Sequence, residues 1–218
     1  MSYEAVTRNL ATVALMQRIA QQRSAIERCQ FCKTPVPGVH RHLLEVATRR
    51  MVCSCDACAR KFQYLVRDRL KLIPRGARLL PDFAMPESLW EDFAMPINLA
   101  FFYRETASGK VVALYPSRTG ATESPLSGEL WERLEMDNPE LVDMEPDVEA
   151  LLVNRVGGAR EYFVTPMDAC YELTGLMRLH WRGLSGGESM WHEIDRFFAS
   201  LRERATVSGP EPAEMIHA

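Results

Sequence analysis

The sequence predicts an α+β protein in which an N-terminal helix and a zinc-ribbon-like module pack on a body of two hairpins and C-terminal helices. Three observations predict this class. Two Cys-x-x-Cys pairs indicate a small metal module, apolar runs bounded by turn residues indicate hairpins, and three-to-four spacing of apolar residues indicates helices. Strands and helices do not alternate strictly, which argues against a parallel α/β sheet. The 218 residues are 47% hydrophobic and 25% charged, which excludes the disordered and fibrous classes.

The first segment, residues 1–26, is predicted to contain an amphipathic helix. Val6, Leu10 and Val13 follow helical spacing within residues 4–26. The segment lacks an uninterrupted apolar core followed by a small-residue cleavage site, and no stretch of the chain approaches the roughly 18 apolar residues of a membrane span. We therefore expect a cytoplasmic protein with no membrane span. Thiols stay reduced in that compartment, so clustered cysteines there indicate metal binding rather than disulfides.

Residues 27–80 are predicted to form the metal module. Short strands are expected at residues 42–46 and 50–53, and a helix at residues 56–66. The four predicted ligands are Cys29 and Cys32, then, after a gap of 22 residues, Cys55 and Cys58. Two cysteines three positions apart in a tight turn direct both sulfurs at one ion, and two such turns complete a tetrahedron.

Zinc is the expected ion, because a redox-inert ion suits a site whose four positions are all filled by protein ligands. Iron in a rubredoxin-like site is the alternative, since sulfur tetrahedra hold either metal, and it would make the protein a redox protein. Rubredoxin turns generally have glycine after the second cysteine, whereas Lys33 and Ala59 occupy those positions here. This difference favours zinc.

Three further residues of the module are candidate ligands or neighbours of the metal. Cys53 shares a face with Cys55 if the chain is extended, because residues two apart in a strand point the same way. His40 and His42 lie in the gap between the two cysteine pairs. These residues either cover the module surface, or form a second metal site or a cluster with extra thiols.

Residues 81–205 are predicted to form the α+β domain. Strands at residues 99–105 and 111–115 form one hairpin, and strands at 150–156 and 160–165 form another around Gly157 and Gly158. Helices are expected at residues 127–136, from Thr165 as a cap to about residue 182, and at 188–204. Cys170 is expected to be a buried core residue. Residues 206–218 are predicted to be a disordered tail.

Two polar segments of this domain are candidate ligand or partner loops. The first contains His180, Arg182, Ser185, Gly186 and Gly187 and either binds an anion or simply ends a helix. The letters Gly-x-Ser-x-Gly at residues 183–187 lack the preceding strand that a nucleophilic serine requires.

The second segment is a hydroxyl-rich loop that follows a strand and contains Ser117 and Thr119. It matches no phosphate-binding motif. No catalytic residue is predicted.

The formal net charge of −3 conceals two oppositely charged halves. Residues 1–80 contain 15 Lys and Arg and 5 Asp and Glu, whereas residues 81–218 contain 11 and 24. A basic module makes nucleic acid a candidate partner, although its Lys and Arg residues are scattered and no known nucleic-acid-binding motif is present. A protein partner is the preferred expectation.

The chain also resembles an uncharacterised bacterial family encoded in gene clusters for nickel–iron uptake hydrogenases. The resemblance covers about residues 27–204 and rests on these runs: CQFC at 29–32, HRHLL at 40–44, CSCDACA at 53–59, AFF at 100–102, VVALYPS at 111–117, GATES at 120–124, residues 145–156 and HWRGLSGG at 180–187. It implies a role in support of hydrogenase assembly, maturation or electron transfer, with a hydrogenase subunit or an assembly factor as the expected partner. It carries over no catalytic residue. A metal module without a convincing catalytic motif adds the expectation of a non-enzymatic accessory protein.

Overall fold

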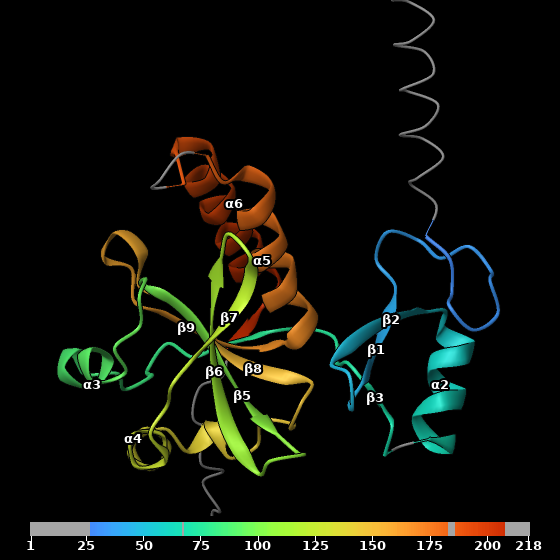
Figure 1. Cartoon of the computed structure of the whole chain (residues 1–218), viewed down its shortest axis with the longest axis horizontal. Coiled ribbons are helices and arrows are strands. Elements are labelled where there is room, and N and C mark those ends of the chain that lie inside the picture. Colours follow the sequence, from blue (N-terminus) through green and yellow to red (C-terminus); the bar gives the residue numbers. More distant parts are fainter. Residues whose placement is uncertain (1–26, 67, 183–185, 208–218) are drawn as a thin grey trace, which may run out of the picture. The chain divides into compact units, whose positions relative to one another are not determined.

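The computed structural model describes residues 27–66, 68–182 and 186–207. The chain divides into two compact units, Met1–Leu72 and Ile73–Ala218. Each unit combines a largely antiparallel sheet with helices, so the predicted α+β class is confirmed (Figure 1). The helix predicted within residues 4–26 lies outside the described residues.

The described residues of the first unit, 27–66 and 68–72, form a three-stranded antiparallel sheet and one helix. The strands are β1 (Arg41–Glu45), β2 (Arg50–Ser54) and β3 (Leu70–Leu72), in the order β2-β1-β3, and the helix is α2 (Asp56–Leu65). Leu43 of the central strand is opposite Val52 on one side and Leu72 on the other. Leu43, Val52 and Ala59 are buried, so a small apolar core forms around β1, β2 and α2.

The second unit is built on a seven-stranded sheet in the order β10-β4-β9-β8-β5-β6-β7. Its neighbouring strands are antiparallel except for the parallel pair β10–β4. The strands are β4 (Arg78–Leu79), β5 (Leu99–Glu105), β6 (Lys110–Ser117), β7 (Gly120–Ser124), β8 (Glu149–Asn154), β9 (Glu161–Pro166) and β10 (Thr206–Val207).

Helices cover both faces of this sheet (Figure 1). Phe101 of β5 packs in one apolar cluster with residues of α5 (Met167–His180) and α6 (Glu188–Arg204). Its neighbour Phe102 points to the opposite face and packs in a second cluster with residues of α3 (Glu87–Asp92), α4 (Gly128–Asp137) and the 3₁₀ helix η1 (Pro139–Leu141). The central strands are therefore buried on both faces, which explains their continuous apolar runs.

The two hairpins predicted in this unit are confirmed. In the second one, the connection includes the 3₁₀ helix η2 (Val156–Gly158), where Gly157 and Gly158 have φ values of +61° and +86°. Glycine adopts such values without steric cost, so this pair permits the reversal between β8 and β9. The predicted cap at Thr165 is wrong: this residue is buried within β9, and no side-chain cap bond precedes α5.

The sequence predicts a loop at residues 115–124, but in the structure β6 continues to Ser117 and Gly120–Ser124 form strand β7. Pro116 and the hydroxyl-rich run after it argue against a strand when taken alone. In the structure, Pro116 lies beyond the last β6 residue paired with β5 and opposite Ala121 of β7. Proline is tolerated there because only one neighbouring strand is present.

The prediction of a disordered tail is wrong for its first two residues. Thr206 and Val207 form β10, which pairs with Arg78 and Leu79 of β4, and the N–H of Thr206 donates to the carbonyl of Ala77 at 2.9 Å. This pairing joins segments far apart in the sequence, so no local pattern signals it. Residues 208–218 lie outside the described residues.

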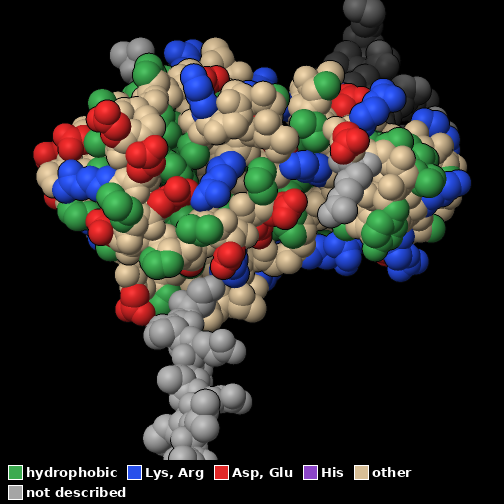
Figure 2. All heavy atoms as spheres, turned by 90° about the horizontal axis from the view of Figure 1, so that it is seen from below, with side chains coloured by type: hydrophobic (Ala, Val, Ile, Leu, Met, Phe, Trp, Pro, Cys, Tyr) green, Lys and Arg blue, Asp and Glu red, His purple; other side chains and the backbone are tan. Residues whose placement is uncertain are grey.

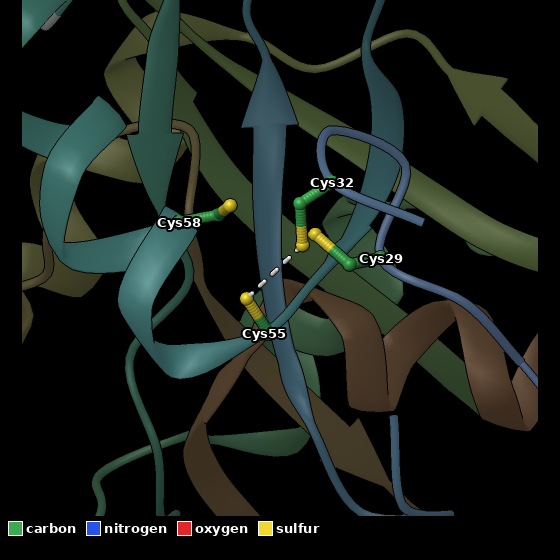
Figure 3. Close-up of side chains that lie close together, drawn as sticks. All are labelled: Cys29, Cys32, Cys55 and Cys58. Atoms are coloured by element: carbon green, nitrogen blue, oxygen red, sulfur yellow. Dashed lines mark hydrogen bonds between the residues drawn. The ribbon is translucent and has the colours of Figure 1, made fainter. Parts of the chain in front are cut away.

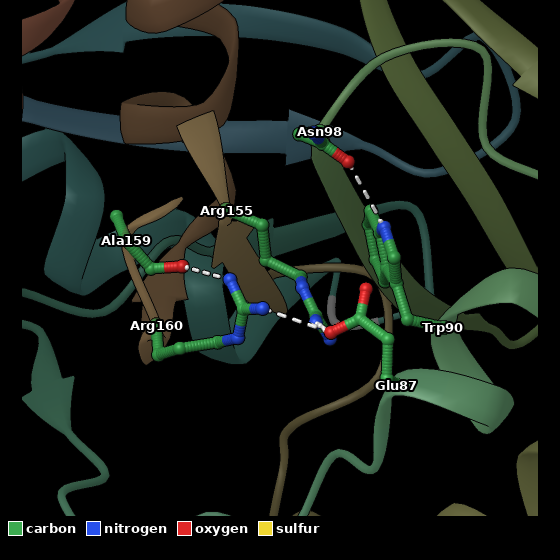
Figure 4. A network of polar contacts seen from close by, with 6 residues as sticks. All are labelled: Glu87, Trp90, Asn98, Arg155, Ala159 and Arg160. Atoms are coloured by element: carbon green, nitrogen blue, oxygen red, sulfur yellow. Dashed lines mark hydrogen bonds and ion pairs between the residues drawn. The ribbon is translucent and has the colours of Figure 1, made fainter. Parts of the chain in front are cut away.

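A buried arginine connects α3 to the end of β8 (Figure 4). The Arg155 side chain is 2% exposed, and its guanidinium lies 5.3 Å from the centroid of the Trp90 ring. It pairs with the carboxylate of Glu87, which also accepts a hydrogen bond from Arg160 at 2.8 Å. The indole N–H of Trp90 donates to Asn98 at 3.1 Å, and the Arg155 N–H donates to the Asn98 carbonyl at 2.8 Å. These contacts hold α3 against the sheet.

We expect Glu87→Ala to lower the free energy of unfolding of the second unit by about 1–3 kcal/mol. It leaves the buried Arg155 guanidinium without its carboxylate, and the partial exposure of Glu87 keeps the cost below that of breaking a fully buried pair. Urea denaturation measures the change. Glu91→Ala, on the same helix but exposed, is the control and is expected to stay within about 0.5 kcal/mol of wild type. Equal effects of the two variants would contradict this account.

Candidate metal centre

The first cysteine pair lies in a tight turn between Arg28 and Pro35, which form an isolated bridge. The N–H of Cys29 donates to the Thr34 carbonyl, and the N–H of Lys33 donates to the Cys29 carbonyl, both at 2.9 Å. Lys33 adopts a φ of +64°, the left-handed conformation that glycine usually supplies, and its ammonium donates to the Gln30 carbonyl at 2.8 Å. Lys33 therefore adopts, after the second cysteine of the turn, the left-handed conformation for which rubredoxin turns generally have glycine.

The second cysteine pair is at the beginning of α2. Cys55 is the N-cap residue, Cys58 lies in the first turn, and the N–H of Ala59 donates to the Cys55 carbonyl at 2.9 Å. The positive end of the helix dipole favours thiolates at this position. The sequence predicts two similar turns, as in a zinc ribbon; the structure has one turn and one helix N-terminus.

The structure brings the four predicted ligands together (Figure 3). One sulfur atom from each of Cys29, Cys32, Cys55 and Cys58 lies within 4.8 Å of the other three, and the sulfurs of Cys32 and Cys55 are 3.7 Å apart. A tetrahedral site with Zn–S bonds of about 2.3 Å has sulfur–sulfur distances of roughly 3.8 Å. The four cysteines are therefore positioned to hold a metal ion.

The surroundings of the cluster lower the pKa of one cysteine and raise the pKa of another. Burial opposes ionisation of Cys29, but the backbone N–H groups of Cys32, Cys55 and Phe31 outweigh it and lower the pKa to about 6. Burial raises the pKa of Cys58 to about 12, and the sulfurs of the other three cysteines add to this effect. A cation held by these four sulfurs would offset the negative charge of the thiolates and favour release of the remaining thiol protons to solvent.

Two contacts hold the turn against the rest of the unit. The N–H of Gln30 donates to the Cys53 carbonyl of β2 at 2.9 Å. The ring of Phe31, within the first cysteine pair, stacks on Phe62 of α2 with centroids 4.2 Å apart. These contacts fix the position of the cysteine-bearing turn relative to β2 and to the helix that carries the second cysteine pair.

A second group of potential ligands lies on one face of the β1–β2 hairpin. His42 and Cys53 are directly opposite each other, and His40 precedes His42 by two residues. One ligand atom from each of the three lies within 4.8 Å of the others. Burial raises the pKa of Cys53, and the negative charges of Glu27 and Cys29 add to this effect.

A protein-family model matches most of the chain and shows the family to which the chain belongs. The model of the family of unknown function DUF5947 matches residues 28–205. The chain belongs to DUF5947. Comparison of this DUF5947 member with the curated proteins and with the solved structures finds no match. Within residues 27–66, 68–182 and 186–207, no helix has both the length and the apolar character needed to cross a bilayer.

The hydroxyl-rich candidate loop of the DUF5947 member, which contains Ser117 and Thr119, forms a local turn. Ser117 donates to the Gly120 carbonyl at 2.9 Å, and its oxygen lies 2.9 Å from the Thr119 hydroxyl and 2.8 Å from that of Thr122. These bonds close the β6–β7 hairpin. The hydroxyl groups of Ser117, Thr119 and Thr122 therefore have a structural role in this turn.

The other candidate loop, which contains His180 and Arg182, follows α5. His180 is the last residue of that helix, the N–H of Arg182 donates to the Gly186 carbonyl at 2.9 Å, and the Arg182 side chain donates to the carbonyls of Leu179 and Trp181. Gly187 is the N-cap residue of α6. Ser185 lies outside the described residues. Cys170 is fully buried in the core, as predicted.

Sequence reasoning missed a groove of about 610 Å³ on the first unit. Its apolar lining includes Phe31, Val52 and Phe62. Its charged lining has the cations of Lys33, Arg50 and Arg69 and one carboxylate, that of Glu45, which pairs with Arg50. Figure 2 shows Lys and Arg side chains around this unit. An aromatic residue inside the first Cys-x-x-Cys pair is the sequence signal that could have indicated it.

Proposed function

We propose that the four-cysteine cluster binds one zinc ion that stabilises the fold of the first unit. The observation that carries this proposal is the convergence of four sulfurs from a tight turn and a helix N-terminus. A site filled by four thiolates has no open position for substrate, which is typical of structural zinc. The first unit has a small core, and domains of that size commonly depend on a metal for stability.

We further propose that the protein is a non-enzymatic accessory protein for a nickel–iron hydrogenase, acting in its assembly, maturation or electron transfer. The sequence resemblance supports this role. The local bonds of Ser117 and Arg182 are also consistent with it, because they give these polar residues structural roles. Affinity capture from the native host, followed by mass spectrometry, tests the proposal: a hydrogenase component is expected, and its absence under cross-linking conditions would contradict the role.

The groove on the first unit is the surface we assign to the protein partner. Its apolar lining and its excess of cations over the single carboxylate of Glu45 suit a segment that combines apolar and acidic side chains. The same features also suit a single-stranded nucleic acid, in which bases stack on aromatic rings. Binding of an oligonucleotide that weakens steeply with salt would replace the protein partner by nucleic acid.

Removal of the metal by a strong chelator is expected to unfold residues 27–72 and to leave residues 73–207 folded. The ion connects segments that otherwise share only a few buried side chains. Amide NMR spectra resolve the two units, and one equivalent of zinc is expected to restore the lost signals. Unchanged signals from the first unit in metal-free protein would rule out a stabilising ion.

Arg69→Glu is expected to weaken capture of the partner about tenfold, which corresponds to roughly 1.4 kcal/mol, because it reverses a charge in the groove. Arg60→Glu is the matched control: it is an exposed arginine of the same unit and does not line the groove. Quantitative pull-down at two salt concentrations measures both variants. If they bind equally well, the groove is not the docking surface.

A further inference from the structure

His40 is the unusual member of the second group of potential ligands. Its side chain is only 3% exposed. One ring nitrogen, Nδ1, lies 2.9 Å from the Pro37 carbonyl, which can only accept a hydrogen bond. The other, Nε2, is buried and has no hydrogen-bond partner among residues 27–66, 68–182 and 186–207. A buried polar atom in this situation calls for an explanation.

The bond to Pro37 determines which nitrogen carries the proton. Nδ1–H donates to the carbonyl, so the neutral ring has its lone pair on Nε2. A metal-ligating histidine is typically held in this way, with the second nitrogen donating to a backbone carbonyl. The Glu27 carboxylate lies 3.4 Å from Nδ1, on the side of the ring away from Nε2.

Packing alone does not explain the arrangement. The rings of His40 and His42 meet edge to face with centroids 4.6 Å apart, which accounts for their proximity. This ring contact does not provide a hydrogen-bond partner for Nε2 of His40. Cys53 lies directly across the hairpin from His42 and supplies a sulfur within 4.8 Å of a ligand atom of each histidine. Two imidazoles and one thiol on one face form a donor set for a transition-metal ion.

We propose that His40, His42 and Cys53 bind a second metal ion, a divalent ion such as Zn²⁺ or Co²⁺. Two nitrogens and one sulfur suit Zn²⁺ or Co²⁺, and three protein ligands leave one coordination position for water or for a donor from a partner. This open position makes the ion exchangeable, in contrast to an ion enclosed by four thiolates. The inference does not depend on which metal the four-cysteine cluster holds.

Cobalt binding to the full chain tests the proposal directly. Protein carrying one equivalent of zinc is titrated with Co²⁺, and the bound cobalt is examined by X-ray absorption. One equivalent of Co²⁺ is expected to bind without release of zinc, in a shell with two imidazole nitrogens and one sulfur. Absence of a bound equivalent, a shell of four sulfurs, or a shell without sulfur would each overturn the proposal. This measurement needs no variant and is unaffected by misfolding of one.

Variants provide the second arm of the test. His42→Ala and Cys53→Ala are each expected to weaken binding of the added Co²⁺ by at least about 100-fold while zinc in the first site is retained. His192→Ala, a histidine of the second unit, is the control and is expected to bind Co²⁺ like wild type. Wild-type affinity in either His42→Ala or Cys53→Ala, or a loss in His192→Ala, would overturn the assignment.

Discussion

Cys29→Ser is expected to remove the tightly bound zinc and to unfold the first unit, while the second unit keeps its unfolding transition. Serine is a poor ligand for zinc, and Cys29 is the most buried of the four cysteines, so its loss also disrupts the core around the turn. Apparent binding energies of structural zinc sites are about 10–16 kcal/mol at neutral pH, far more than so small a core supplies. Metal content and the NMR signals of residues 27–72 measure the result.

Cys170→Ala is the matched control for this variant. Cys170 is equally buried but lies in α5 of the second unit, within the apolar core. The substitution is expected to leave the metal content unchanged and to cost about 1 kcal/mol through the small cavity it creates. A Cys29→Ser protein that retains stoichiometric metal and a folded first unit would show that this cysteine is not a ligand.

Phe102→Ala is expected to lower the free energy of unfolding of the second unit by about 3–5 kcal/mol without changing the metal content. Phe102 is fully buried in β5, and its ring centroid lies 5.3 Å from that of Phe93 and 5.8 Å from that of Trp131. Truncation leaves a cavity where the sheet meets α3 and α4, and these neighbours cannot fill it without moving. Urea denaturation of the second unit measures the loss.

Phe102→Leu separates the size of the cavity from a general effect of mutation. Leucine keeps most of the volume, so the expected loss is smaller than that of alanine by roughly 2 kcal/mol. A loss below about 1 kcal/mol for Phe102→Ala would contradict the placement of this ring at the centre of the core. The two sets of variants act on separate units, so their effects are expected to be independent.

The candidate metal cluster was predictable because its signal is local. The spacing of the two cysteine pairs predicted convergence of Cys29, Cys32, Cys55 and Cys58, and residues 56–66 already read as a helix. The long hairpins were predictable for a similar reason: their apolar runs and the Gly157–Gly158 turn lie within short windows. In both cases a few neighbouring residues determine the local structure.

Features that depend on distant partners were not predictable. Strand β7 contains glycine, threonine and serine and exists because β6 pairs with it. Strands β4 and β10 have two residues each and join segments from opposite ends of the second unit. Whether Cys53 meets the two histidines stays open from the sequence, because it depends on the hairpin register, in which His42 is opposite Cys53. The groove near Phe31 required the stacking of this turn on α2.

Metal analysis of the natively purified protein tests the central claim most directly. The His42→Ala variant is used so that only the four-cysteine cluster contributes, and the protein is purified without added metal. Elemental analysis and a visible spectrum are expected to show one zinc per chain and a colourless protein. A metal-free folded protein, or stoichiometric iron with visible absorption, would contradict a structural zinc site.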